Sequence, residues 1–145
     1  MDVFTDEYFM RKAIEQAEIA RLKGEVPVGA VVVADNTVIA KAYNMTETLK
    51  DVTAHAEMQA ITMAANFLGG KYLTGCIMYV TLEPCSMCAG ALKWSQISKL
   101  VYGASDTKNG MGMHEGLFHP KTAIKSEVLA KECEELIKNF FKEKR

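Results

Sequence analysis

The sequence predicts one α/β domain over residues 1–145, built as three layers (α/β/α) with helices on both faces of a mixed five-stranded sheet. The chain has 145 residues, of which 49% are hydrophobic, and this is enough to bury a core of its own. Apolar runs typical of strands alternate with runs of helical periodicity, an order that favours crossover connections and parallel strands. The first two strands differ, because a short turn is expected to join them into an antiparallel hairpin.

A helix and this hairpin account for the first third of the chain. The helix is expected to begin at Thr5 and to end before Gly24. Its apolar positions keep the i, i+3, i+4 spacing of a helix packed on a core: Met10, Ala13, Ile14, Ala17 and Ala20. Two apolar strands follow at 26–34 and 37–43. The Asp-Asn pair at 35–36 joins them, since both residue types tolerate the positive φ of a tight turn.

A strand between two helices forms the middle of the chain. The second helix is expected to take Thr53 as its N-cap and to stop at Gly69. Its periodic apolar run consists of Met58, Ile61, Met63, Ala64, Phe67 and Leu68. A third strand at 75–81 then leads into a third helix at 84–93, and a fourth strand follows at 99–102.

The last third begins with an irregular segment at 104–125. A loop of this length in a compact domain is usually functional or mobile. The fifth strand is expected at 126–130, and an amphipathic helix over 132–144 ends the chain. Its apolar face is Leu136, Ile137, Phe140 and Phe141.

His55 and Glu57 are the residues on which the functional interpretation depends. They lie two positions apart at the expected start of the second helix, and two positions turn a helix by about 200°, so they cannot share a side face. Both can nevertheless reach one point beyond the helix end. Free N–H groups and the positive end of the helix dipole favour thiolates and hydroxide at that point.

Cys85 and Cys88 provide the metal-type partners of His55. They follow Pro84, which favours a helix start, and they are i, i+3 neighbours, so their sulfurs can converge on one zinc ion. Three protein ligands leave the fourth tetrahedral position for water, as in catalytic zinc sites. Glu57 is then expected to carry protons beside that water. Thiolate and imidazole ligands favour Zn²⁺, one ion per subunit.

The motif H-x-E followed by P-C-x-x-C is the signature of the cytidine-deaminase-like zinc superfamily, which this chain resembles. The flanking runs EVPVGAVVV (25–33), TLEPCSMCAGA (81–91) and GASDTKNG (103–110) are similar to the bacterial tRNA-specific adenosine deaminases. This resemblance extends over nearly the whole chain. It implies the cytidine-deaminase-like fold.

The family resemblance also implies a reaction. A zinc-bound hydroxide would attack C6 of the wobble adenosine in a tRNA anticodon loop, with Glu57 as the proton shuttle, and give inosine. No organic cofactor is expected, and a homodimer is implied with sites built at its interface. The substrate contacts carried over are Val26, Asn44, Ala56, Pro84, Asp106 and Phe141. Lys108, Lys144 and Arg145 are the positions expected near the RNA backbone.

Two other functions stay open at this level. A deaminase of a free nucleobase or nucleoside, of the guanine or cytosine type, would share the zinc site and differ in its pocket. A structural-zinc module that binds RNA without chemistry would need a fourth protein ligand, for which His114 and His119 are available, and would not depend on Glu57.

Composition limits the class of protein further. The formal net charge of −1 gives no global attraction to nucleic acid, so an RNA substrate would need a local basic rim. The amino terminus has no basic apolar leader, and no run approaches the roughly 18 apolar residues of a membrane span, so a cytoplasmic location without membrane contact is expected. Cys76 and Cys133 are expected to be ordinary buried thiols.

Overall fold

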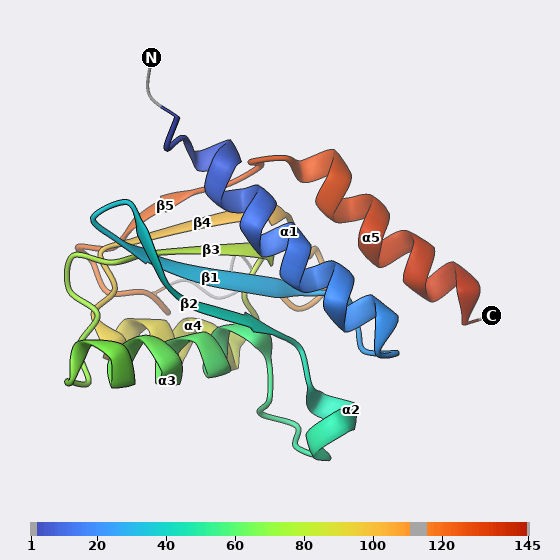
Figure 1. Ribbon diagram of the computed structural model, residues 1–145, viewed down its shortest axis with the longest axis horizontal. Coiled ribbons are helices and arrows are strands. Elements are labelled where there is room, and N and C mark those ends of the chain that lie inside the picture. The colour runs from blue at the N-terminus through green and yellow to red at the C-terminus, as the bar shows by residue number, and fades with distance from the viewer. Residues whose placement is uncertain (1–2, 111–115, 145) are drawn as a thin grey trace.

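The computed structural model describes residues 3–110 and 116–144, and its centre is one five-stranded sheet in the order β2-β1-β3-β4-β5 (Figure 1). The strands are β1 (Gly29–Ala34), β2 (Thr37–Tyr43), β3 (Ile77–Leu82), β4 (Lys99–Ala104) and β5 (Ala123–Lys125). The helices are α1 (Asp6–Leu22), α2 (Thr46–Leu49), α3 (Ala56–Leu68), α4 (Ser86–Ser95) and α5 (Ala130–Glu143). Within these ranges no helix is both long and apolar enough to cross a bilayer.

The sheet is mixed, as the sequence predicts. β1 runs antiparallel to both of its neighbours, β2 and β3, whereas β3, β4 and β5 are parallel. The connection from β2 through α3 to β3 therefore passes over β1, and the connection from β3 through α4 to β4 joins adjacent strands. β2 and β3 run in the same direction, so the helices that follow them begin at the same edge of the sheet. The start of α3 and the start of α4 consequently meet.

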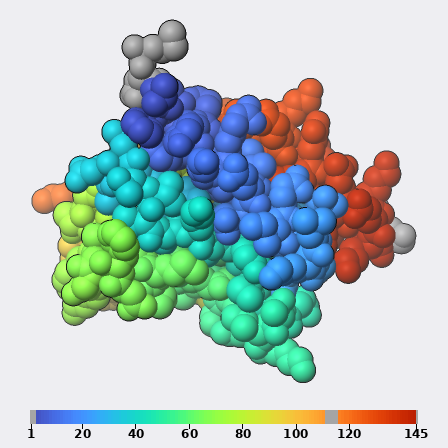
Figure 2. Space-filling view, in the orientation of Figure 1, coloured from blue at the N-terminus to red at the C-terminus, as the bar shows by residue number. Residues whose placement is uncertain are grey.

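Helices cover both faces of the sheet and confirm the three-layer prediction. α1 and α5 pack on one face, and α3 and α4 pack on the other (Figure 1). Figure 2 shows α1 crossing the molecule between the β1–β2 hairpin and α5. Alternate residues of β1 enter the two cores: Ala30 and Val32 face α3, whereas Val31 and Val33 face α1.

The local signals at the start of the chain are confirmed. The Thr5 side chain accepts a hydrogen bond from the Tyr8 amide at 3.1 Å and so caps α1. Asp35 and Asn36 both adopt positive φ, 48° and 58°, as a two-residue hairpin turn requires. β1 begins at Gly29 rather than at residue 26, because residues 25–28 form a separate segment beside α2.

The fifth strand lies elsewhere than predicted. The expected strand at 126–130 is wrong, because Glu127 and Leu129 have positive φ values of 64° and 54° that interrupt an extended run. Leu129 instead precedes the first turn of α5. The strand that pairs with β4 is Ala123–Lys125, within the segment expected to be a loop.

Two helix starts also differ from the prediction by two residues. His55, not Thr53, occupies the N-cap position of α3, since Thr53 donates its amide and hydroxyl to Asp51 in the preceding turn. Cys85 occupies the N-cap position of α4, so Pro84 precedes the helix instead of opening it. Both differences place a predicted metal ligand at the N-cap position of a helix.

Small side chains, not the large ones, form the buried face of α3. Ala56, Ala60 and Ala64 pack against the sheet, whereas Met63 and Phe67 are 43% and 66% exposed. In the apolar run recognised in the sequence, Ala64 is buried and Ile61 packs partly buried against the same core, but the other members do not mark the core-facing side. Alanines allow α3 to approach the sheet closely and leave a large apolar surface outside.

Gly29 marks an equally close approach of α1 to β1 and supports a prediction on stability. A Cβ atom at Gly29 would collide with the Ala13 carbonyl oxygen and the Ala17 amide nitrogen, which are backbone atoms that cannot rotate away. Gly29→Ala is expected to lower the free energy of unfolding by about 1–3 kcal/mol, as overpacking of a core does. Urea denaturation of the zinc-loaded protein measures this.

The control is Gly90→Ala in α4, where a Cβ would meet nothing within 4 Å. Alanine in a helix is about 0.5–1 kcal/mol more favourable than glycine, so this variant should be at least as stable as the parent. Equal stability of the two variants would contradict the proposed contact between α1 and β1.

Candidate active site

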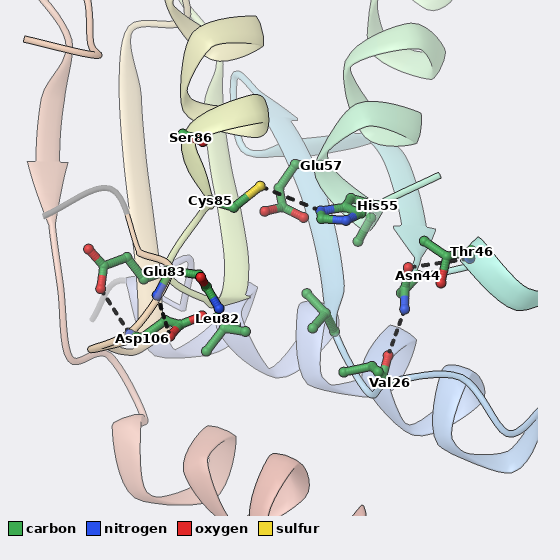
Figure 3. Close-up of a pocket in the computed structure, with 13 residues that line it drawn as sticks. Val26, Asn44, Thr46, His55, Glu57, Leu82, Glu83, Cys85, Ser86 and Asp106 are labelled. Carbon is green, nitrogen blue, oxygen red and sulfur yellow. Dashed lines mark hydrogen bonds between the residues drawn. The ribbon is translucent and has the colours of Figure 1, made fainter. Parts of the chain in front are cut away.

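The starts of α3 and α4 bring three metal-type side chains together. His55 is the N-cap residue of α3, Cys85 is the N-cap residue of α4, and Cys88 lies in the first turn of α4. The Nδ1 atom of His55 is 3.7 Å from the Cys85 sulfur and 3.5 Å from the Cys88 sulfur. Figure 3 shows His55 and Cys85 pointing at one another from the two helices. The ligand set predicted from the motif is thus assembled in space.

The spacing of these atoms fits a zinc ion. With Zn–N near 2.0–2.1 Å and Zn–S near 2.3 Å, a tetrahedral angle places nitrogen and sulfur about 3.5–3.6 Å apart. The three ligand atoms also lie within 4.8 Å of one another, and the described residues contain no fourth histidine, cysteine or carboxylate in this group. His119 is therefore not a ligand here, and His114 lies outside the described residues. Among the residues described, the donor set is that of an open, catalytic zinc site.

Hydrogen bonds among the ligands prepare them for a cation. Bonds from Cys88 and then from His55 lower the pKa of Cys85 to about 3, so this sulfur is a thiolate. The hydrogen bond to Cys85 raises the pKa of Cys88, and the same thiolate raises the pKa of His55. The Cys85 thiolate thus favours a proton on Cys88 and a proton on His55. A divalent cation bound among the three side chains would replace both protons.

Glu57 lies in the first turn of α3, directly beside the three ligands (Figure 3). Its side chain is only 3% exposed, and burial raises its pKa to about 7. A carboxylate with this pKa can both take up and release a proton near neutral pH, as general acid–base catalysis requires. The geometry therefore allows the role of proton carrier that the sequence suggested.

A cavity of about 460 Å³ opens onto Glu57 and onto two of the ligands, His55 and Cys85. This is within the range of roughly 300–1,000 Å³ typical of small-molecule sites. Four of the predicted substrate contacts line it: Val26, Asn44, Ala56 and Asp106. Sequence reasoning did not single out six further lining residues: Val28, Thr46, Leu82, Glu83, Ser86 and Asn109.

Hydrogen bonds hold one wall of this cavity in place. The Asn44 side chain donates to the Val26 carbonyl at 3.5 Å and accepts from the Thr46 amide at 3.4 Å (Figure 3). Beneath them the fully buried Glu25 carboxylate accepts hydrogen bonds from the Glu47 amide at 3.1 Å and the Thr48 amide at 2.6 Å. Burial alone would raise its pKa, but these bonds and the Thr48 hydroxyl hold the pKa of Glu25 below its usual value. Glu25 is thus an ionised clamp between the start of α2 and the segment before β1.

The remaining predicted contacts lie away from the cavity lining. Pro84 sits between two lining residues without lining the cavity itself. Phe141 on α5 is 49% exposed, so it does not belong to the buried apolar face of that helix, whereas Phe140 is 7% exposed. Lys108 and Lys144 are exposed, and Arg145 lies outside the described residues. Their contacts with RNA stay predictions.

Comparison with known proteins agrees with this site. The family model of the cytidine and deoxycytidylate deaminase zinc-binding region matches residues 4–104. The tRNA-specific adenosine deaminase of Bacillus subtilis (strain 168) is 44% identical, over 97% of this chain and 91% of its own length.

Two solved structures resemble this chain in both fold and sequence. One, from a study of A-to-I editing by tRNA:A34 deaminases at the wobble position of transfer RNA, has a TM-score of 0.84 and 41% identity, covering 89% of this chain and 98% of its own. The guanine deaminase of Bacillus subtilis has a TM-score of 0.68 and 36% identity, covering 81% of this chain and 72% of its own. With a zinc-binding deaminase model matched over most of its length and a 44% identical relative along nearly all of it, the chain belongs to the cytidine and deoxycytidylate deaminase family and, within it, to the tRNA-specific adenosine deaminases.

Proposed function

We propose that this protein hydrolyses the 6-amino group of the wobble adenosine in a tRNA anticodon and leaves inosine and ammonia. The observation that carries the proposal is the buried Glu57 beside three convergent metal ligands at a cavity large enough for a nucleoside. The tRNA substrate is supported by the relatives that cover nearly the whole chain.

The chain's own residues divide the chemistry between them. His55, Cys85 and Cys88 would hold zinc, which when bound lowers the pKa of a coordinated water toward about 7 and makes it nucleophilic. Glu57 accepts a proton as the C6–O bond forms and delivers a proton to N1 of adenine. Glu57 then takes the proton of the new C6 hydroxyl and gives it to the amino group, so that the C6–N bond breaks, the C6 carbonyl forms and ammonia leaves. One buried carboxylate thus acts first as base and then as acid.

Residues around the cavity would hold the target adenine, turned out of the stacked anticodon bases, and the nucleotides next to it. Asn44 and Val26 stand on one wall, Ala56 lies beside the ligands, and Asp106 stands on the opposite wall. The exposed Lys108, Phe141 and Lys144, with Pro84 and Arg145, would contact nucleotides outside the cavity. A chain with a net charge of −1 needs such a local rim for RNA binding.

We also propose that two copies form a homodimer in the cytoplasm. The C-terminal ends of the neighbouring helices α3 and α4 carry Phe67 and Trp94, which are 66% and 81% exposed. Large apolar side chains that are this exposed are candidates for an interface. A second copy would bury them on the same two helices that carry the zinc ligands at their other ends. Sedimentation velocity measures this directly, and a monomer at micromolar concentration would contradict the dimer.

The decisive assay measures inosine in an anticodon stem-loop with a wobble adenosine, alongside ammonia release from free adenosine, cytidine and guanine. We expect reaction with the stem-loop and none with the three small molecules. Release of ammonia from guanine without RNA editing would instead favour the nucleobase branch, to which the 36% identical guanine deaminase belongs. No reaction with any of the four would favour a structural-zinc module.

A further inference from the structure

A buried carboxylate that the chemistry above does not use lies under the Asp106 wall of the cavity. Glu83 is 7% exposed, and its Oε1 atom accepts a hydrogen bond from the Asp106 backbone amide at 2.9 Å (Figure 3). Carboxylates are almost never buried unless they are paired. The pairing with the Asp106 amide links the strand that leads to the cysteines with the loop across the cavity.

The loop that donates this bond is a closed turn. Asp106 Oδ1 accepts from the Lys108 and Asn109 amides, each at 3.1 Å, and the Gly110 amide donates to the Asp106 carbonyl at 3.0 Å. Asp106 and Asn109 both line the cavity. These bonds tie residues 106–110 into one unit, and Glu83 holds that unit through the Asp106 amide.

The far end of the same turn rests on Glu83 and on a metal ligand. Gly110 forms an isolated antiparallel bridge with Cys85. A Cβ atom at Gly110 would collide with the Asp106 carbonyl oxygen and with the Glu83 carboxylate. Only glycine leaves room for the turn, the carboxylate and the start of α4 to sit together.

From these contacts we propose that Glu83 is a positioning residue for substrate. It sets the 106–110 turn, and through it the Asp106 side chain, at a fixed distance from the zinc ligands. Glu83 takes no part in proton transfer. The choice of a stem-loop as the substrate in the test rests on the proposed function, whereas the role of Glu83 in holding the turn does not.

The cost of losing this contact follows from its geometry. Without an acceptor the Asp106 amide loses its hydrogen-bond partner, and the turn is no longer held in place at this end. A misplacement of about 1 Å in a positioning element can lower catalysis by about 10²-fold. We expect the shift to weaken substrate binding first, because Asp106 and Asn109 of this turn line the cavity, whereas the zinc ligands and Glu57 are held at the starts of α3 and α4.

The test compares Glu83→Ala with Glu83→Gln, which keeps an acceptor oxygen in nearly the same place. For the stem-loop, Glu83→Ala is expected to raise KM about tenfold or more and to lower kcat/KM by about 10²-fold. Glu83→Gln should stay within about threefold of the parent. Bound zinc, measured by atomic absorption, should be unchanged in both variants.

A double-mutant cycle shows whether Glu83 acts through Asp106. In an Asp106→Ala background, Glu83→Ala should lower kcat/KM by less than about threefold, because residues that act as one unit are not additive. Losses that multiply would overturn the proposal, as would a Glu83→Ala enzyme with normal KM and only a lower Tm. Gly110→Ala should raise KM in the same way as Glu83→Ala.

Amide hydrogen exchange gives a readout that needs no substrate. The Asp106 amide should exchange at least about tenfold faster in Glu83→Ala and at the parent rate in Glu83→Gln. Unchanged exchange in Glu83→Ala would overturn the proposal. If the parent enzyme leaves the stem-loop unreacted, the proposed function fails, and the exchange rates still decide whether Glu83 holds the turn.

Discussion

Replacing Glu57 by glutamine is expected to lower kcat by about 10³-fold or more while zinc stays bound. General acid–base catalysis alone contributes roughly 10²–10⁴-fold, and in the proposed reaction one carboxylate serves every proton transfer. Glutamine fills the same buried volume, 3% exposed, but can neither accept a proton from water nor pass one to adenine N1. Inosine formation on the stem-loop under single-turnover conditions measures the change.

The same substitution at an exposed position provides the control. Glu15 lies on the outer side of α1, far in sequence from the site, and Glu15→Gln should keep full activity. Zinc content and stem-loop affinity should match in the parent, Glu57→Gln and Glu15→Gln proteins. If Glu57→Gln retained near-normal turnover, another group would have to carry the protons, and the assignment of Glu57 would be wrong.

The metal ligands could be predicted because each depends on a local signal. His55 and the two cysteines stand at helix starts that Gly, Pro and apolar periodicity identify without any tertiary information. The exact caps could not be predicted, since Thr53 looks like the better N-cap until its hydroxyl is seen donating to Asp51. The predicted start of α3 is wrong by only two residues, yet this difference decides which side chain occupies the N-cap position.

The short fifth strand escaped prediction for a different reason. Residues 123–125 are exposed at the edge of the sheet and pair on one side only, so they need no alternating apolar pattern. The prediction fell instead on 126–130, which ends in the apolar run Val128, Leu129 and Ala130. Its positive φ values are imposed by the turn into α5, which is a tertiary requirement that no local pattern carries.

The two buried carboxylates of the cavity walls show why part of the site needs a structure. Glu25 binds amides 22 and 23 residues further along the chain, and Glu83 binds one 23 residues further along. Both lie in sequence runs that resemble the family, but only contacts across the fold distinguish a structural carboxylate from a solvated one. A charged residue at the end of an apolar run was the available signal.

Replacing Cys88 by alanine is expected to abolish turnover by removing a metal ligand. Only His55 and Cys85 would remain, and we expect zinc affinity to fall by more than the roughly 10–100-fold that loss of a group behind a ligand costs. Zinc measured after dialysis should drop from one ion per chain to near zero. Added zinc should raise the Tm of the parent protein from which zinc has been removed, because a ligand at about 1,000 times its Kd stabilises a fold by about 4 kcal/mol. The Tm of Cys88→Ala should stay unchanged when zinc is added.

Cys76→Ala separates the ligand role of Cys88 from its packing role. Cys76 and Cys88 are 1% and 0% exposed, and both variants lose one buried sulfur, so each should be destabilised by about 1 kcal/mol through the small cavity left behind. Only Cys88 belongs to the group of three ligands. Cys76→Ala should therefore keep its zinc, its zinc-dependent rise in Tm and its activity. Zinc retained by Cys88→Ala, or lost equally from both variants, would show that Cys88 affects the metal through packing and is not a ligand.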